Sequence, residues 1–220
     1  MAAGLEVLND YGTYVIDGTN IAPYMIAKGT STTIGTAYSP HRNPYYQKIT
    51  LPSDTELCVV RCPGKWVHYS IGKVNGVVSL WIETHGAASF TYYAFKYGQH
   101  PGAGFGMEVF SPTGQLIFTS AAKMLGIVSS HLLNFSSTTL SRESGRVYAQ
   151  VIGFPRAFET WDGAGNTYSE KDALNYNEST GVVTRGVFNG STSIVSTNTS
   201  WIDSVSGGYP TMMNVDITNL

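Results

Sequence analysis

The feature that most constrains the fold of this chain is a short motif that occurs twice. Residues 4–18 read GLEVLNDYGTYVIDG, and residues 106–120 read GMEVFSPTGQLIFTS. Two glycines, a glutamate and a valine are identical at an offset of 102 without a gap, and the apolar positions around them are kept. Repeats of this kind decide an architecture, since each copy tends to form the same local structure. We therefore predict two related units.

Each copy of the motif has the pattern of a β-hairpin. A short strand with alternating apolar residues leads into a four-residue turn that ends in glycine, and a second strand returns. The two turns are Asn9-Asp10-Tyr11-Gly12 and Ser111-Pro112-Thr113-Gly114. Proline in the second position and glycine in the fourth are typical of a type I turn.

The composition predicts an all-β fold. Charged residues make up only 13% of the chain, whereas Gly (24) and Tyr (14) are abundant. Aromatic and β-branched side chains suit a pleated surface, and glycine supplies turns. Many short strands with regular turn signals predict two β-sandwich or Greek-key-like domains related by duplication. Strands are expected near 22–27, 46–51, 56–61, 66–71, 77–83, 90–97, 106–110, 115–119, 124–129, 146–152, 180–188, 192–197 and 211–217.

A stretch rich in glycine and proline divides the chain. It reads Gly98-Gln99-His100-Pro101-Gly102-Ala103-Gly104 and is typical of a linker. We predict a first domain over 1–99, a linker over 100–104 and a second domain over 105–220. Because it has fewer long loops, the first domain is the candidate anchor, and the second would face outward.

Two polar, turn-rich stretches of the second domain, 159–177 and 189–208, are predicted to be long loops. Loops of such length are usually functional or disordered. Aromatic residues among Gly, Asn and Ser suit contact with a sugar ring or a partner protein, and packing of the loops on themselves is the alternative. The candidate recognition aromatics are Trp161, Tyr168, Tyr176, Trp201 and Tyr209.

The charge pattern and the ends of the chain exclude several classes. The net charge is −2 with no basic stripe, so we expect no nucleic-acid partner. No apolar run is long enough for a membrane span, and we expect no membrane insertion. The N-terminus lacks a basic region followed by an apolar stretch, so we expect no signal peptide. We expect the protein to be synthesised in a cytoplasm.

No residue pattern predicts an enzyme, a metal site or a cofactor. The sequence has no G-x-S-x-G elbow, and its five histidines lie apart. Residues 162–166 resemble a calcium loop only faintly, and a plain turn is the favoured interpretation. Cys58 and Cys62 would lie roughly 13 Å apart in an extended strand, too far for a disulfide, and no further zinc ligands follow. We predict two reduced thiols.

The repeated element, G-[LM]-E-V-[LF]-x-x-x-G-x-x-[VI]-[IF], resembles a group of small virion proteins of tailed bacteriophages, encoded among tail-tip and tail-fibre genes. Those proteins open with a Gly-Leu-x-Val-aromatic-Asn/Asp-x-x-Gly hairpin, and some repeat it. Here the aromatic is replaced by Leu8 in the first copy and is present as Phe110 in the second. The Asp-Ser pair that often follows is only half matched by Asp17-Gly18 and Thr119-Ser120.

The resemblance covers about thirty residues and implies a structural virion protein of a tail tip or fibre. It implies assembly with itself, for which we expect a homotrimer, and with other tail proteins. Contact with a glycan or protein of the host surface is a further expectation. The resemblance supplies no catalytic residue. The alternative function is a carbohydrate-binding β-sandwich without a virion role, whose binding would depend on Trp161 or Trp201.

Overall fold

The computed structural model describes residues 7–8, 14–16, 23–35, 45–98, 106–111, 113–132, 137–153, 157–161, 167–189, 194–196 and 211–220. Every regular element in these ranges is a β-strand, which confirms the all-β prediction. None of the described residues belongs to a helix that could cross a membrane.

Eight strands precede residue 100. They are β1 (Val7–Leu8), β2 (Tyr14–Ile16), β3 (Tyr24–Gly35), β4 (Tyr45–Thr50), β5 (Leu57–Arg61), β6 (Trp66–Val74), β7 (Val77–Thr84) and β8 (Ala88–Lys96). Ten follow it within the described ranges. They are β9 (Glu108–Phe110), β10 (Leu116–Thr119), β11 (Gly126–Leu132), β12 (Ser137–Thr139), β13 (Tyr148–Gly153), β14 (Ala157–Trp161), β15 (Thr167–Asn177), β16 (Val182–Asn189), β17 (Ile194–Ser196) and β18 (Thr211–Asp216).

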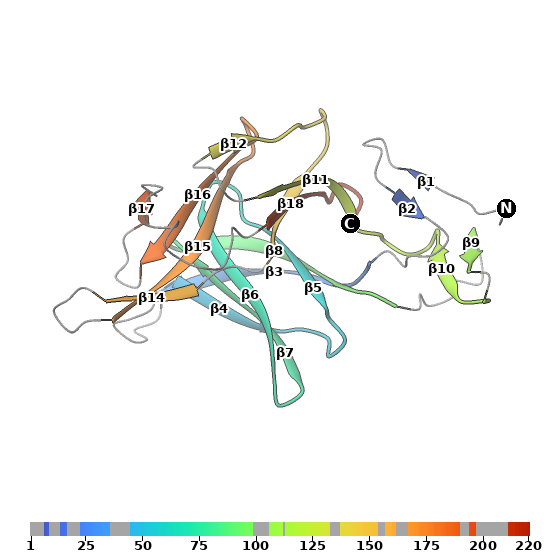
Figure 1. Ribbon diagram of the computed structural model, residues 1–220, viewed down its shortest axis with the longest axis horizontal. Helices are drawn as coiled ribbons and strands as arrows, with labels where there is room; N and C mark the ends of the chain where they lie inside the picture. The colour runs from blue at the N-terminus through green and yellow to red at the C-terminus, as the bar shows by residue number, and fades with distance from the viewer. Residues whose placement is uncertain are drawn as a thin grey trace.

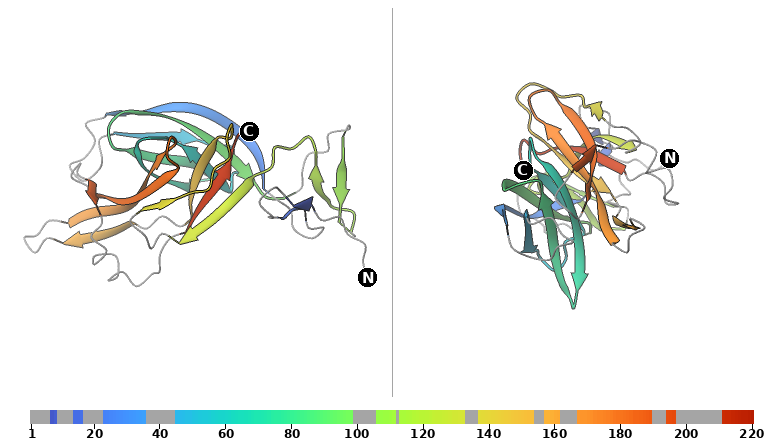
Figure 2. Two further views of the ribbon diagram at one scale, coloured as in Figure 1. Left: turned by 90° about the horizontal axis from the view of Figure 1, so that it is seen from above. Right: turned by 90° about the vertical axis from the view of Figure 1, so that its left-hand side faces the viewer.

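The two copies of the motif form two small sheets, and the other described strands form one large sheet. β1 pairs with β2, and β9 pairs with β10, both antiparallel. The large sheet has 14 strands, with the order β11-β18-β13-β5-β8-β3-β4-β7-β6-β15-β16-β12, while β14 pairs with β15 and β17 with β16. Both small sheets lie at one end of the molecule, beside the large sheet (Figures 1 and 2).

The first six strands of this order close into a ring. The Met25 N–H donates to the Lys123 carbonyl (2.9 Å) and the Leu125 N–H to the Pro23 carbonyl (3.0 Å), around a bridge between Tyr24 and Met124. The segment that leads into β11 therefore borders the start of β3, at the other edge of the run. The ring encloses an apolar cluster made of Val59, Tyr93, Phe95, Leu125, Ala149, Val151, Val215 and Ile217.

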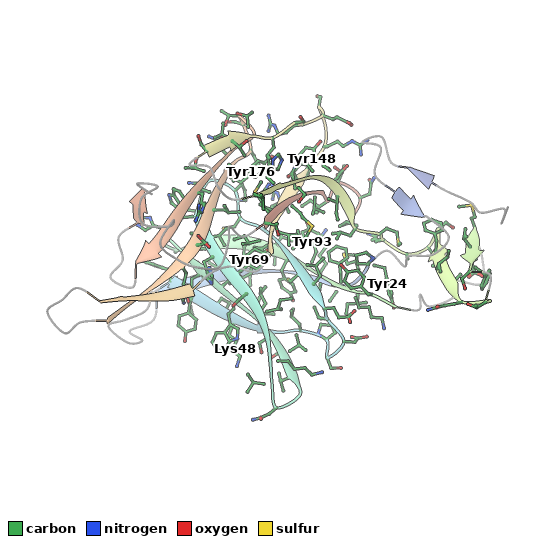
Figure 3. All side chains as sticks on the ribbon, viewed as in Figure 1. Tyr24, Lys48, Tyr69, Tyr93, Tyr148 and Tyr176 are labelled. Carbon is green, nitrogen blue, oxygen red and sulfur yellow. The ribbon has the colours of Figure 1, made fainter. Side chains whose placement is uncertain are left out.

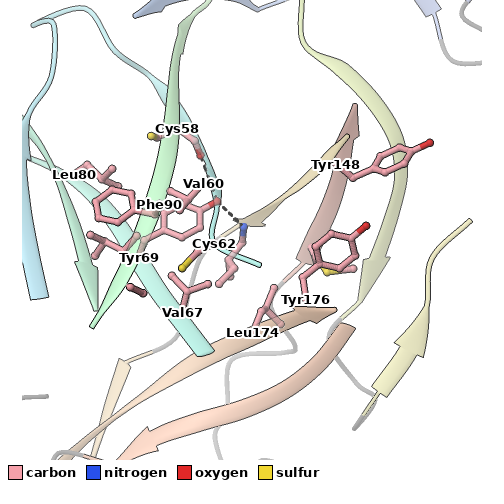
Figure 4. Packing of buried hydrophobic residues seen from close by; sticks show 14 of the residues in the cluster. Cys58, Val60, Cys62, Val67, Tyr69, Leu80, Phe90, Tyr148, Leu174 and Tyr176 are labelled. Carbon is pink, nitrogen blue, oxygen red and sulfur yellow. Dashed lines mark hydrogen bonds between the residues drawn. The ribbon is translucent and has the colours of Figure 1, made fainter. Parts of the chain in front are cut away.

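A second core lies between the wall of the ring and the remaining strands of the sheet. Cys58, Val60 and Phe90 enter it from the ring, and Leu80 and Leu174 enter it from the opposite layer (Figure 4). β3 is long enough to belong to both layers, since it pairs with β8 along most of its length and with β4 at its end. Alternation of side chains along each strand of the ring wall explains how one strand serves both cores.

Both cores and the large sheet cross the boundary predicted near residue 100. β5 pairs with β13, and β6 pairs with β15, so strands from the two halves are neighbours at two places in the sheet. Each core contains residues from both halves. The halves share one hydrophobic interior in the described residues; the linker predicted over 100–104 lies outside them.

Five of the six strands predicted for the first half match observed strands closely, whereas the strand predicted near 22–27 is longer and extends as β3 to Gly35. Asn75 and Gly76, with φ of 50° and 81°, form the turn between β6 and β7, as their Asn-Gly pattern predicted. The loop predicted over 159–177 was wrong. Most of it forms β14 and β15, and β15 runs through the sheet between β6 and β16. The buried Asp172 occupies an inward position of β15 and interrupts the apolar alternation that marks a strand.

Candidate functional site

The second hairpin, β9–β10, has the turn that its sequence predicted. The Gly114 N–H donates to the Ser111 carbonyl at 2.9 Å, which closes a four-residue turn, and Gly114 has a φ of 80°. The Ser111 N–H also donates to the Gln115 carbonyl, and the Gln115 N–H donates to the Ser111 side chain at 3.1 Å. The serine thus fixes both ends of the turn.

Gly106, the first glycine of the motif, allows the hairpin to close at its base. Its φ of 124° lies in the region that favours glycine, and a Cβ there would lie 2.4 Å from the Ser120 hydroxyl. That hydroxyl accepts a hydrogen bond from the Met107 N–H at 3.0 Å, and the Ser120 N–H donates to the Met107 carbonyl. The motif therefore needs glycine at this position for a steric reason.

The first hairpin has the same register as the second. Val7 lies opposite Ile16, and Val109 lies opposite Phe118, which are the same positions at an offset of 102. The pair Leu8–Tyr14 corresponds in the same way to Phe110–Leu116, and a register irregularity lies between the two pairs in both hairpins. The turn Asn9–Gly12 lies outside the described residues. The prediction that both copies of the motif form hairpins is confirmed.

The second hairpin exposes two apolar side chains. Leu116 and Ile117 are buried, whereas Met107 is 49% and Phe110 is 54% exposed. Phe110 occupies the aromatic position of the motif, and Leu8 is its counterpart in the first copy. Exposed apolar groups on a small element that stands beside the main body are typical of an interaction surface. We call Met107 and Phe110 the hairpin patch.

A second group of polar and charged side chains lies where β6 and β15 meet. Glu83 on β7 pairs with Lys171 on β15, and the next residue, Asp172, is fully buried and pairs with Arg185 at 2.9 Å. His68 on β6 is also buried, and its Nδ1 lies 2.7 Å from the Asp172 carbonyl. These five residues, which we call the charged cluster, connect the two halves of the chain.

The geometry of the charged cluster indicates a structural role. Since a carbonyl only accepts, the proton of the neutral His68 ring lies on Nδ1. Burial lowers the pKa of His68, and the Asp172 carbonyl and the Glu83 carboxylate oppose this shift only in part. Each carboxylate of the cluster has a cation beside it, which is the usual condition for charges inside a protein.

The two cysteines are free and buried, as predicted. Burial raises the pKa of the Cys58 thiol to about 12 and that of the Cys62 thiol to about 11. Because the thiolate is the reactive form, neither group is a nucleophile at neutral pH.

An open hollow of about 490 Å³ lies beside the ends of β5, β6 and β8. Lys96 and Asp54 line it and pair with each other at 2.8 Å, and Tyr97, which is 52% exposed, lies at the same hollow. The remaining lining residues include no histidine or cysteine that could act as a base or a nucleophile. The hollow therefore does not resemble an acyl-transfer site.

The structure separates the candidate recognition aromatics. Tyr176 lies in β15 and is only 4% exposed within the core, so its prediction as a recognition residue was wrong (Figure 3). Trp161 and Tyr168 lie at the end of the β14–β15 hairpin, where Thr160 is opposite Tyr168. Trp201 and Tyr209 lie outside the described residues. The hairpin patch and the charged cluster were not among the predicted site residues.

Among the described residues, no group of three or more His, Cys, Asp or Glu side chains could hold a metal ion. Comparison with known proteins finds no matching family, and no curated protein or solved structure is significantly similar to the chain.

Proposed function

We propose that this protein is a structural virion component of a tailed bacteriophage, placed in the tail tip or a tail fibre. The observation that carries the proposal is the hairpin patch. Met107 and Phe110 are exposed on a hairpin beside the main body, and Phe110 fills the aromatic position of the motif that resembles tail proteins. In this proposal the patch is buried against a neighbouring virion protein.

Complementation of a phage that lacks the gene tests this proposal. The variant Phe110→Asp would place a charge at the proposed contact, where desolvation without a partner is unfavourable. Val74→Asp is the matched control, because Val74 is 67% exposed at the β6–β7 turn, away from both hairpins (Figure 1). We expect at least a tenfold loss of Phe110→Asp from purified virions, roughly 1.4 kcal/mol or more, and normal incorporation of the control.

Unchanged unfolding midpoints for both variants would assign the loss to assembly. Absence of the wild-type protein from purified virions, or equal incorporation of the two variants, would contradict the proposal. The proposed homotrimer is tested separately by light scattering, which would give three times 23.8 kDa in solution. Host-surface contact through a glycan or protein remains part of the proposal and would appear as binding of the purified protein to host cells.

A further inference from the structure

Four strand pairings of the first half recur in the second, while the pairing of β3 with β4 has no counterpart among the described strands. In the first half, β8 lies between β3 and β5, and β7 lies between β4 and β6. In the second half, β18 lies between β11 and β13, and β16 lies between β12 and β15. The chain order of these strands is also the same, if β14 and β17 are taken as additions of the second half. All eight pairings are antiparallel.

The registers of the two halves agree as well. Tyr24 on β3 lies opposite Lys96, and Gly126 on β11, 102 positions later, lies opposite Asp216. Both pairs of strands then contain a bulge at corresponding residues, Ile26 in β3 and Val128 in β11. Both bulge residues pack against the core between the layers. Bulges are specific features of a fold, and their shared position is difficult to explain by general β-propensity.

Within the described part of the large sheet, the two halves pair with each other at three places, and each contact joins two equivalent segments. At the ring seam, β5 pairs with β13 (Val60 opposite Gln150). At the outer seam, β6 pairs with β15 (Val67 opposite Leu174). At the closure of the ring, Tyr24 at the start of β3 bridges Met124, just before β11. All three contacts are antiparallel, as a two-fold axis between the equivalent strands requires.

The interior of the ring follows the same relation. Leu57 lies opposite Phe95 in the first half, and Ala149 lies opposite Val215 in the second. The ring cluster contains all four residues, with Leu57 partly buried at its border. Equivalent strands therefore send side chains into one shared core from opposite sides.

We propose that this chain is a fused dimer, in which two copies of one eight-strand unit pack about a pseudo-two-fold axis. The partner that the edges of β5 and β6 fit is the second copy, supplied here by the same chain. The interface is isologous, since the same edges of both units take part. This inference does not depend on the proposed virion role.

The proposed two-fold axis predicts how far apart the two ends of the chain lie. Twelve residues separate Lys96 from the equivalent valine of the second hairpin, Val109. If the axis exists, Asp216 and Val7 are placed like Lys96 and Val109. Joining Leu220 to Met1 through two added residues would place twelve residues between them too.

The test is a series of circular permutants of the whole chain, opened between Gly102 and Ala103. Their Leu220–Met1 joints would carry zero, two or eight added residues. We expect the two-residue joint to give a folded protein whose unfolding midpoint is within about 4 °C of wild type. Lengthening the joint to eight residues should bring no gain, because loop-closure entropy changes slowly with length.

The proposal would be overturned if a permutant folded only with the eight-residue joint, or if no joint length gave a folded protein. In either case the ends would not be placed as the axis requires. A crystal structure of the unmodified protein provides an independent test. The rotation that superposes β3, β5 and β8 on β11, β13 and β18 should be about 180°. A clearly different rotation would also overturn the proposal.

Discussion

The ring seam and the outer seam join the same two halves by different chemistry. At the ring seam, most of the buried side chains are apolar, among them Val59 and Val151, and the polar Gln150 donates its side-chain amide to Asn214. At the outer seam, the charged cluster carries His68, Glu83 and Lys171 across the contact. Apolar packing contributes strongly to stability but tolerates small changes in the relative position of the strands. Buried ion pairs lower stability unless their geometry is satisfied. We infer that the ring seam supplies stability and the outer seam fixes the register.

The largest expected effect comes from breaking the charged cluster. Arg185→Ala would leave the carboxylate of Asp172, which is fully buried, without its closest cation. We expect a loss of about 3–5 kcal/mol in the free energy of unfolding, measured by urea denaturation. The double variant with Asp172→Asn should recover part of this loss. If Arg185→Ala costs less than about 1 kcal/mol, the outer seam does not depend on its charges.

The hydroxyl of Tyr69 is the polar contact that connects β6 to the ring seam. It donates to the Gln150 carbonyl at 2.9 Å. It also accepts from the Ile152 N–H at 3.2 Å (Figure 4). Tyr69→Phe would leave both backbone groups buried without this partner, and we expect a loss of about 1–3 kcal/mol in urea denaturation. A neutral result would mean that water replaces the hydroxyl, and that apolar packing alone holds the ring seam.

The outer seam should also respond to pH. Burial lowers the pKa of His68 in the folded protein, so the unfolded chain binds that proton more readily. Stability is then complete above about pH 6.5 and falls as the pH drops toward 5, by at most about 1.4 kcal/mol per pH unit. His68→Asn, whose amide can still donate to the Asp172 carbonyl, should flatten this dependence in unfolding measurements between pH 5 and 7.5. An unchanged slope would assign the pH dependence to other groups.

The smallest expected effect concerns a surface contact between the halves. Arg61 at the end of β5 donates two hydrogen bonds, of 2.7 and 2.8 Å, to Glu178 in the turn after β15. Both side chains are about one-third exposed, at 30% and 35%. Glu178→Gln should therefore cost only about 0.2–1 kcal/mol, and less at high salt. A loss as large as that of Tyr69→Phe would show that this surface pair contributes as much as the buried contacts.

The sequence predicted what depends on neighbouring residues. The turn of the second hairpin, the Asn75-Gly76 turn and most strands of the first half follow from local turn chemistry and alternation. The ring could not be predicted in this way, because its closure joins residues 23–25 to 123–125. Pairing over such a separation leaves no local pattern.

The site was harder to predict than the fold for a related reason. The strand β15 carries the charged Asp172 at a buried position, and polar and charged residues in sequence are typical of a loop, so Tyr176 was interpreted as exposed. Glu83 and Arg185, which pair with Lys171 and Asp172 of β15, lie on other strands. They mark a buried network only once the register is known. Phe110 was visible in the sequence as the aromatic of the motif, but its exposure required the structure.

The closure of the ring also affects how tightly the molecule can bind a neighbour. Each of the two bridged segments follows one hairpin along the chain, and both hairpins lie at the same end of the molecule (Figures 1 and 2). A neighbour with two matching sites could therefore engage both hairpins of one chain. Once the first is bound, the second meets its site at an effective concentration of millimolar order, and avidity can exceed either single affinity by roughly 10²–10⁴. Loss of one hairpin would then shorten the lifetime of the complex far more than twofold.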